Sequence, residues 1–173
     1  NGNGTFQAAV NYAAGGVPNG VVAVDLNGDG HNDLSVANNY SNNVSVLINN
    51  GDGTFQTAVN YPTGQQCSSI FAGDLNGDGI ADLAATNSNS NTISTLVNNG
   101  DGTFQSEIEY AAGTGPRSIV GSDFDGNGGI DLAVANLNSQ NISVYLNRTT
   151  TAISSELFEY PTRLSLSQNY PNP

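Results

Sequence analysis

Apolar and polar residues alternate along short stretches of the chain. In the first third, the alternation covers residues 20–26, 33–38, 43–49 and, less regularly, 54–61. Gly, Asn and Asp bound each stretch. Alternation with a period of two over short runs that end in turn residues predicts strands with one buried face. We therefore expect four strands here, joined by an acidic loop, a Tyr-Ser-Asn turn and an Asn-Gly-Asp-Gly hairpin.

The same pattern returns every 49 residues. The segment DLNGDG begins at Asp25 and again at Asp74, and the related DFDGNG begins at Asp123. A second landmark, Gly-Thr-Phe-Gln, recurs with the same spacing around Phe6, Phe55 and Phe104. A fixed period of 20–50 residues indicates a repeat architecture. A four-stranded antiparallel unit of this length has the size of a β-propeller blade.

The fold expected for residues 1–147 is all-β, with three four-stranded antiparallel, propeller-like blades. An N-terminal strand at residues 5–12 precedes two complete repeats, and the third repeat stops after its third strand at about 141–147. Propellers have about four to eight blades, so three are too few to close alone. We expect the N-terminal strand to complete the last blade, either in cis or in a neighbouring molecule. The alternative is that the chain is a piece of a longer propeller protein.

Each repeat carries an acidic loop that fits a calcium ion. Calcium takes six to eight oxygen ligands, which carboxylates, amides and carbonyls can supply from a short loop. The predicted ligands are Asp25, Asn27, Asp29, the His31 carbonyl and Asp33; Asp74, Asn76, Asp78, the Ile80 carbonyl and Asp82; and Asp123, Asp125, Asn127, the Gly129 carbonyl and Asp131. Three carboxylates in nine residues repel one another without a cation, so three structural Ca²⁺ sites are expected. Asx turns without metal are the alternative.

These loops are not EF-hands. Position 12 holds Val36, Ala85 and Val134 in place of the bidentate Glu, and strands flank the loops where helices would be required.

The net charge of the chain limits the classes of partner that it can bind. Fifteen Asp and Glu residues against three Lys and Arg give a net charge of -12, which disfavours nucleic acid and anionic membrane surfaces. No stretch of 18 apolar residues predicts a membrane span. The single cysteine, Cys67, cannot form an internal disulfide.

The motifs DLNGDGxxDL and NNGDGTFQ together resemble the FG-GAP or VCBS-type repeat of integrin α-subunit propellers and bacterial surface proteins. The resemblance covers residues 1–147. It implies a propeller-like fold in which the loop between the first two strands of a blade binds calcium. It also implies an extracellular role in adhesion, in glycan binding or as a module beside an enzyme, since members of the family act in these ways.

Residues 161–173 resemble the opening of the C-terminal sorting domain of the type IX secretion system, and the Thr- and Ser-rich residues 148–160 are the expected linker. This resemblance implies that the protein is secreted and is displayed at the cell surface or released. The alternative is a simple extended terminal peptide.

We expect no enzymatic activity. The only histidine, His31, lies in a predicted metal loop, so Cys67 has no second histidine to activate it. Two functions remain. The first is a secreted structural or adhesive protein that associates head to tail, as a fibre or ring, by strand completion. The second is a module that binds glycans or surface proteins, with the recurring Tyr12, Tyr61 and Tyr110 as candidate contacts.

Overall fold

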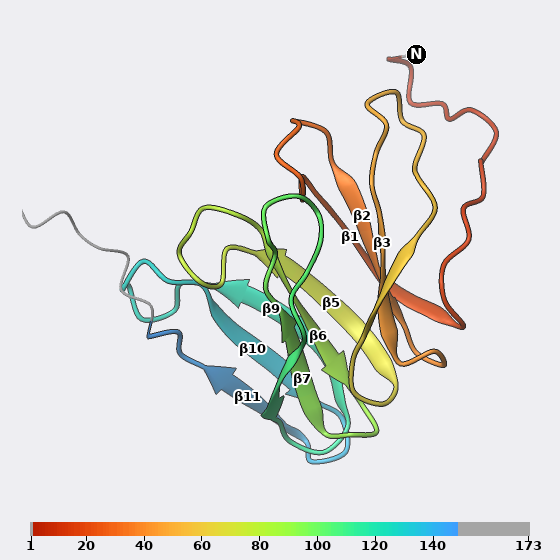
Figure 1. The fold of residues 1–173 in the computed structure, drawn as a ribbon. Coiled ribbons are helices and arrows are strands. Elements are labelled where there is room, and N and C mark those ends of the chain that lie inside the picture. Colours follow the sequence, from red (N-terminus) through yellow and green to blue (C-terminus); the bar gives the residue numbers. More distant parts are fainter. Residues whose placement is uncertain (1, 149–173) are drawn as a thin grey trace, which may run out of the picture.

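The part of the chain that the structure describes is built around three antiparallel sheets. The structure is a computed structural model that describes residues 2–148. Blade 1 contains β1 (Pro18–Val24), β2 (Asp33–Asn38), β3 (Asn43–Leu47) and β4 (Val59–Pro62). Blade 2 contains β5 (Cys67–Gly73), β6 (Asp82–Asn87), β7 (Thr92–Leu96) and β8 (Ile108–Ala111). Blade 3 contains β9 (Pro116–Ser122), β10 (Asp131–Asn136) and β11 (Asn141–Tyr145) (Figure 1). The predicted all-β fold is confirmed.

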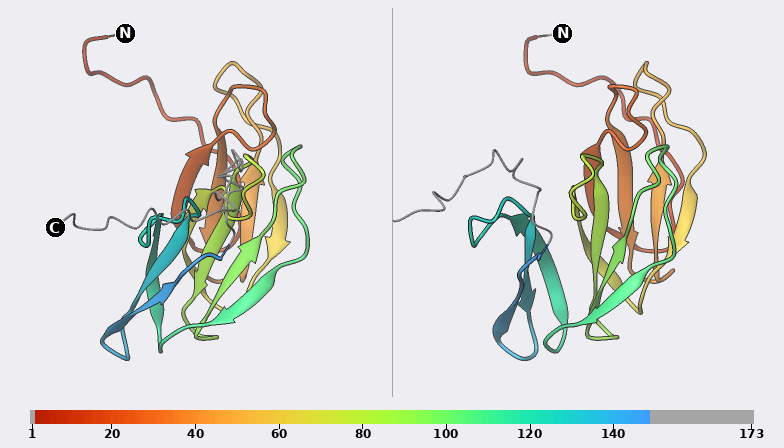
Figure 2. Two further views of the ribbon diagram at one scale, coloured as in Figure 1. Left: turned by 90° about the vertical axis from the view of Figure 1, so that its left-hand side faces the viewer. Right: turned by 60° about the vertical axis from the view of Figure 1, so that its left-hand side comes forward.

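The blades stand side by side in chain order (Figure 2). Within each blade, every strand pairs with the next strand along the chain. The first strands are neighbours across the blades, because β1 lies beside β5 and β5 beside β9. Blade 2 is therefore covered on both faces, whereas blades 1 and 3 each have one face without a neighbouring blade. The three blades do not close into a ring, as expected from their number.

Turn chemistry explains where the strands end. The second strand of each repeat begins at an Asp and ends at an Asn, as the sequence pattern predicted for residues 33–38. Tight turns follow, and their last residues, Asn42, Asn91 and Gln140, have φ values of 54°, 58° and 54°. Asn adopts this left-handed region more readily than most residues. The fourth strand is shorter than the predicted 54–61, since β4 begins only at Val59.

The core lies between the blades. One buried cluster joins blades 1 and 2 and contains Leu26, Val44, Ile70 and Leu83. A second joins blades 2 and 3 around Ile93 and Ile119. Side chains from both faces of blade 2 contribute, because each face meets a neighbouring sheet. Residues 2–148 contain no helix with the length and hydrophobicity that a membrane span needs.

The N-terminal segment differs from the expectation. Residues 5–12 are extended but form no strand, so blade 3 has three strands and not four. The segment runs along blade 1 on the side away from β11 (Figures 1 and 2). Three blades do not bend the stack far enough to bring the segment beside β11. The structure thus shows no completion of blade 3 in cis. The predicted linker and sorting-domain segment, apart from Arg148, lie outside the described residues.

Candidate metal centres and interblade pocket

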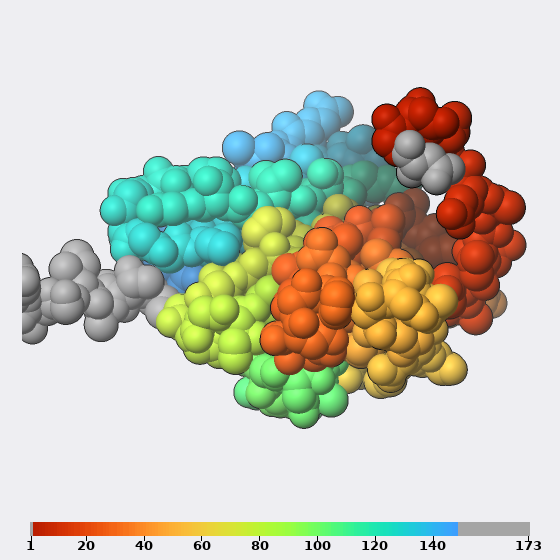
Figure 3. Space-filling view, turned by 90° about the horizontal axis from the view of Figure 1, so that it is seen from above, coloured from red at the N-terminus to blue at the C-terminus, as the bar shows by residue number. Residues whose placement is uncertain are grey.

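The three acidic loops lie at one end of the blades, together with the Asp-Gly hairpins. Figure 3 looks down on this end and shows the loops side by side, coloured orange, yellow-green and cyan along the chain. Each loop joins the first two strands of its blade, which is where the sequence predicted it.

The first Asp of each loop folds the loop around its own carboxylate. Asp25 accepts hydrogen bonds from the backbone amides of Gly28 and Gly30 at 2.8 and 2.9 Å. These two glycines have φ values of 76° and 84°, which a residue with a side chain rarely adopts. The amide of Gly30, followed by smaller contributions from nearby backbone amides, holds the pKa of Asp25 below its usual value, so the carboxylate is ionised at neutral pH. Asp123 is held in the same way, chiefly by Gly128.

The last Asp of each loop is buried and links the loop to the hairpin. Asp82 is fully buried, and its two carboxylate oxygens accept the amides of Leu75 at 3.0 Å and Asn98 at 2.9 Å. Burial raises the pKa of Asp82 despite these bonds. Asp33 and Asp131 are equally buried and make the matching bonds. A cation at the loop would offset the cost of burying this charge.

The third loop brings its three carboxylates together. One oxygen each from Asp123, Asp125 and Asp131 lie within 4.8 Å of one another. Oxygens that bind one Ca²⁺ at about 2.3–2.6 Å are at most about 5 Å apart, so this cluster fits a single calcium ion.

The first two loops have an amide where the third has Asp125. Asn27 Nδ2 donates to Asp29 Oδ2 at 2.9 Å, and Asn76 Nδ2 donates to Asp78 Oδ2 at 2.8 Å. A calcium ion would replace this bond, because it would draw the amide oxygen and the carboxylate to itself. The carbonyls of His31, Ile80 and Gly129 lie in the loops as expected. Ligation by any of these residues, and hence the count of three sites, stays a prediction.

An asparagine that the sequence reasoning missed ties each of the first two loops to the next blade. Asn98 Nδ2 donates to the carbonyl oxygen of Leu26 at 2.8 Å, across the interface between blades 1 and 2. Asn147 Nδ2 donates to the carbonyl oxygen of Leu75 at 2.7 Å, across the next interface. The available signal was the recurrence of Asn at 49, 98 and 147.

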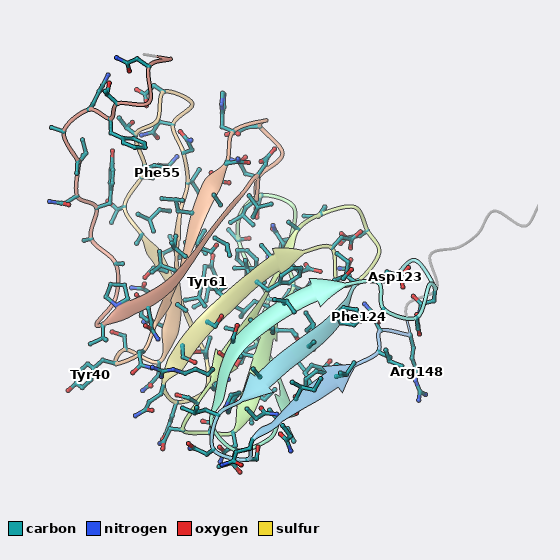
Figure 4. All side chains as sticks on the ribbon, turned by 180° about the vertical axis from the view of Figure 1, so that it is seen from behind. Tyr40, Phe55, Tyr61, Asp123, Phe124 and Arg148 are labelled. Atoms are coloured by element: carbon teal, nitrogen blue, oxygen red, sulfur yellow. The ribbon has the colours of Figure 1, made fainter. Side chains whose placement is uncertain are left out.

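A pocket of about 490 Å³ lies between blades 2 and 3 near this end of the molecule. Its walls include Val97, Ile108, Tyr110, Leu132 and Tyr145. Asp123, Phe124 and Arg148, all at the same end of blade 3, are labelled in Figure 4.

The recurring tyrosines that were candidate glycan contacts each pack against another aromatic ring. Tyr61 meets the ring of Phe104 edge-on, with 5.2 Å between ring centroids. Tyr12 meets Phe55 in the same way at 5.4 Å, and Tyr110 meets Tyr145 at 6.4 Å. Figure 4 labels Tyr61, Phe55 and the separate, outward-pointing Tyr40. The 49-residue recurrence of these tyrosines therefore reflects packing.

Comparison with known proteins gives a family and a fold. A family model for the FG-GAP-like repeat matches residues 25–85 and 76–134, which is more than half of the chain. A comparison with curated protein sequences gave no match.

Among solved structures, the chain is similar to a lectin from Agrocybe aegerita that recognises non-reducing terminal N-acetylglucosamine. The identity is 23% and the TM-score 0.50, over 75% of this chain and 38% of the lectin. It is also similar to the Tc holotoxin pore of Photorhabdus luminescens, at 17% identity and a TM-score of 0.51, over 81% of this chain and 7% of that one. The chain thus spans well under half of either protein, and the likeness shows a shared propeller-type fold.

Proposed function

Because the chain belongs to the FG-GAP-like repeat family, we propose that it is a secreted, calcium-stabilised module that binds glycans outside the cell and has no catalytic activity. The observation that carries the proposal is the separation of charge along the blades. The acidic loops occupy one end, while the turns at the opposite end contain no charged residue in a chain of net charge -12.

The uncharged end consists of the turns before and after the blades' inner strands. It is formed by residues 13–17, 39–42, 63–66, 88–91, 112–115 and 137–140. The nearest charges are Glu109 in β8 and Arg117 in β9. Exposed amides at this end belong to Gln65, Gln66, Asn89, Asn138 and Gln140. We call this surface the amide end.

The chemistry of the amide end suits a neutral sugar. Side-chain amides offer both donors and acceptors to hydroxyl groups. Tyr40 is 81% exposed among them and presents an aromatic face with a polar tip. The fold shared with a lectin that recognises N-acetylglucosamine supports the proposal by analogy. No salt bridge to the ligand is needed, so binding would depend little on ionic strength.

A glycan array probed with the full chain in calcium tests this function. We expect binding to neutral glycans, at least tenfold weaker for Tyr40→Ala, since buried aromatic anchors dominate many interfaces. Thr57→Ala, an exposed change in the hairpin segment of blade 1, is the control and should bind as the native chain does. An array without hits in calcium would remove the proposal.

Calcium is the second part of the proposal. We propose that one Ca²⁺ binds in each of the three loops. The ions would make the acidic end rigid and lower the electrostatic repulsion among nine of the fifteen acidic residues. Calorimetric titration should give a stoichiometry near three. Asp125→Ala, which removes a ligand oxygen altogether, should remove one site, while Asp52→Ala, in a hairpin outside the loops, should remove none. A stoichiometry of zero for the native chain would contradict the proposal that the loops bind calcium.

Self-association is a second candidate function. It is favoured by the face of blade 3 that has no neighbouring blade, where Ile142 and Val144 are 69% and 51% exposed. A structural fibre or ring would cover these side chains.

A further inference from the structure

The pocket between blades 2 and 3 has a filled counterpart between blades 1 and 2. There Phe104, 8% exposed, packs in one buried cluster with Ile48, Tyr61, Leu83 and Leu96. The residues 49 positions after these four neighbours are, in turn, Val97, Tyr110, Leu132 and Tyr145, and all four line the pocket. The pocket therefore lies at the repeat position that a phenylalanine fills in the interface between blades 1 and 2. We call it the Tyr110 slot and its filled counterpart the Tyr61 slot.

The sequence after blade 3 does not repeat the hairpin that delivers this phenylalanine. Gly100 and Gly102 turn the hairpin of blade 2 with φ values of 90° and 79°. Thr149 and Thr151 stand 49 residues later, and β-branched residues strongly disfavour such angles. The motif Gly-Thr-Phe-Gln does not occur again before residue 173.

The N-terminal segment carries the missing hairpin motif in exposed form. Phe6, in the sequence Gly-Thr-Phe-Gln, is 98% exposed. Gly2 and Gly4 have φ values of 65° and 78°, like Gly51 and Gly53 in blade 1 at 86° and 83°.

The turn before Phe6 also has the hydrogen bonds of the blade hairpins. The Thr5 amide and hydroxyl both bond Asn3 Oδ1, at 3.1 and 2.7 Å. In blade 1, the Thr54 amide and hydroxyl bond Asp52 Oδ1 at 2.9 and 2.6 Å. The N-terminal segment thus already has the hairpin conformation before it binds. This lowers the entropic cost of ordering it on binding.

The other end of this segment is already anchored on its own blade 1. Tyr12 packs on Phe55 as Tyr61 packs on Phe104, so the segment holds the place of the outer strand of a preceding blade. It lies on the side of blade 1 away from β11, so it does not reach the Tyr110 slot of its own chain (Figures 1 and 2).

We propose that the Tyr110 slot binds Phe6 of a second copy of this chain, whose residues 10–13 pair with β11. The register follows from β7 and β8, where Thr95 pairs with Ile108 and Thr92 with Ala111. Transferred by the repeat, Val144 pairs with Val10 and Asn141 with Ala13. Blade 3 thereby gains its fourth strand.

The same contact covers the open faces of blades 1 and 3. Ile70 and Ile119 are each 6% exposed because a preceding blade covers them, whereas Val21, at the same repeat position, is 62% exposed. Val44 and Ile93 are at most 1% exposed under a following blade, whereas Ile142 is 69% exposed. Blade 3 of one copy against blade 1 of the next reproduces both buried arrangements. The contact is head to tail, so it grows a filament or closes a ring.

The inference supplies the contact for self-association and does not depend on glycan binding. Light scattering of the full chain, in calcium and over a range of protein concentrations, tests it. We expect oligomers whose size increases with protein concentration. Phe6→Ala should raise the dissociation constant of the contact at least about tenfold. Tyr40→Ala, which changes an exposed aromatic side chain outside the contact, should assemble normally.

Two further arms keep the test decisive. Phe6→Leu should restore part of the assembly, because leucine can fill most of an apolar slot.

A variant ending at Arg148 should assemble as the full chain does. A full chain that stays monomeric at every concentration overturns the proposal. Assembly that begins only after residues 149–173 are removed overturns it as well, because these residues would then be the occupant of the slot. A monomer that still binds glycans would leave the proposed function standing.

Discussion

The two interblade slots have walls at equivalent repeat positions but different contents. In the Tyr61 slot, Phe104 joins blades 1 and 2 and is nearly buried. In the Tyr110 slot, the corresponding position is a pocket of about 490 Å³ between blades 2 and 3. The difference shows that a blade is not a self-contained unit. Its last hairpin completes the interface with the blade before it, and residues 2–148 contain no such hairpin for blade 3.

The largest expected effect comes from emptying the filled slot. Phe104→Ala should lower the free energy of unfolding by about 3–5 kcal/mol, as for other buried Phe→Ala changes that leave a cavity. Denaturant unfolding at low protein concentration measures it. Phe6→Ala, at the exposed equivalent position, should change the stability of the monomer by less than about 0.5 kcal/mol. An equal loss of stability in Phe104→Ala and Phe6→Ala would contradict the difference between a filled and an exposed phenylalanine position.

Removing calcium should act on both slots, because an acidic loop borders each of them. A site filled at 100 times its Kd stabilises the fold by about 2.7 kcal/mol. Thermal unfolding in calcium and then in EDTA should show a large loss of stability. Magnesium should restore little of it, since it requires stricter octahedral geometry. Unchanged unfolding in EDTA would mean that the Asx turns alone hold the loops.

The interblade asparagines give a finer comparison. Asn98→Ala removes the bond to the Leu26 carbonyl beside the filled slot, where Leu26 is 1% exposed. Asn147→Ala removes the equivalent bond beside the open slot, where Leu75 is only partly buried. A buried acceptor left without a partner costs about 1–3 kcal/mol. Denaturant unfolding should therefore show a larger loss for Asn98→Ala than for Asn147→Ala. The reverse order would show that the open slot is already covered by another group.

Ionisation of the Cys67 thiol has the smallest expected effect on stability, because it acts only well above neutral pH. Cys67 belongs to the cluster between blades 1 and 2, and burial raises the pKa of its thiol to about 11. Since the folded pKa lies above the unfolded value, this contribution to stability is complete below about pH 9 and is lost as the pH rises towards 11. Alkylation of the folded chain at pH 8 should be much slower than alkylation in denaturant. Equal rates would mean that this side of the filled slot opens readily.

Local patterns predicted the blades well. The strand at residues 33–38 was predicted with its observed bounds, because an Asp and an Asn mark its ends in every repeat. The acidic loops were also expected between the first and second strands. Both features depend on short-range turn chemistry, which a single sequence displays directly.

Side-chain hydrogen bonds within and between the blades were beyond the sequence reasoning. Asn38, Asn87 and Asn136 are buried at the ends of their strands and bond Ser45, Ser94 and Ser143 of the neighbouring strand in the same blade. Asn98 reaches a carbonyl 72 residues away. Alternation of apolar residues also does not show that both faces of blade 2 are covered, since this depends on the stacking of whole sheets.

The most direct test of the account is a crosslink between two copies. One chain carries Val10→Cys and the other Val144→Cys, while the buried Cys67 stays in place in both. The two positions face each other in the proposed register. On mild oxidation in calcium, we predict a disulfide-linked heterodimer that forms only when both variants are mixed, and that Phe6→Ala in the first chain suppresses. Failure to form it at protein concentrations well above those of the light-scattering test, or equal yield with Phe6→Ala, would contradict the account.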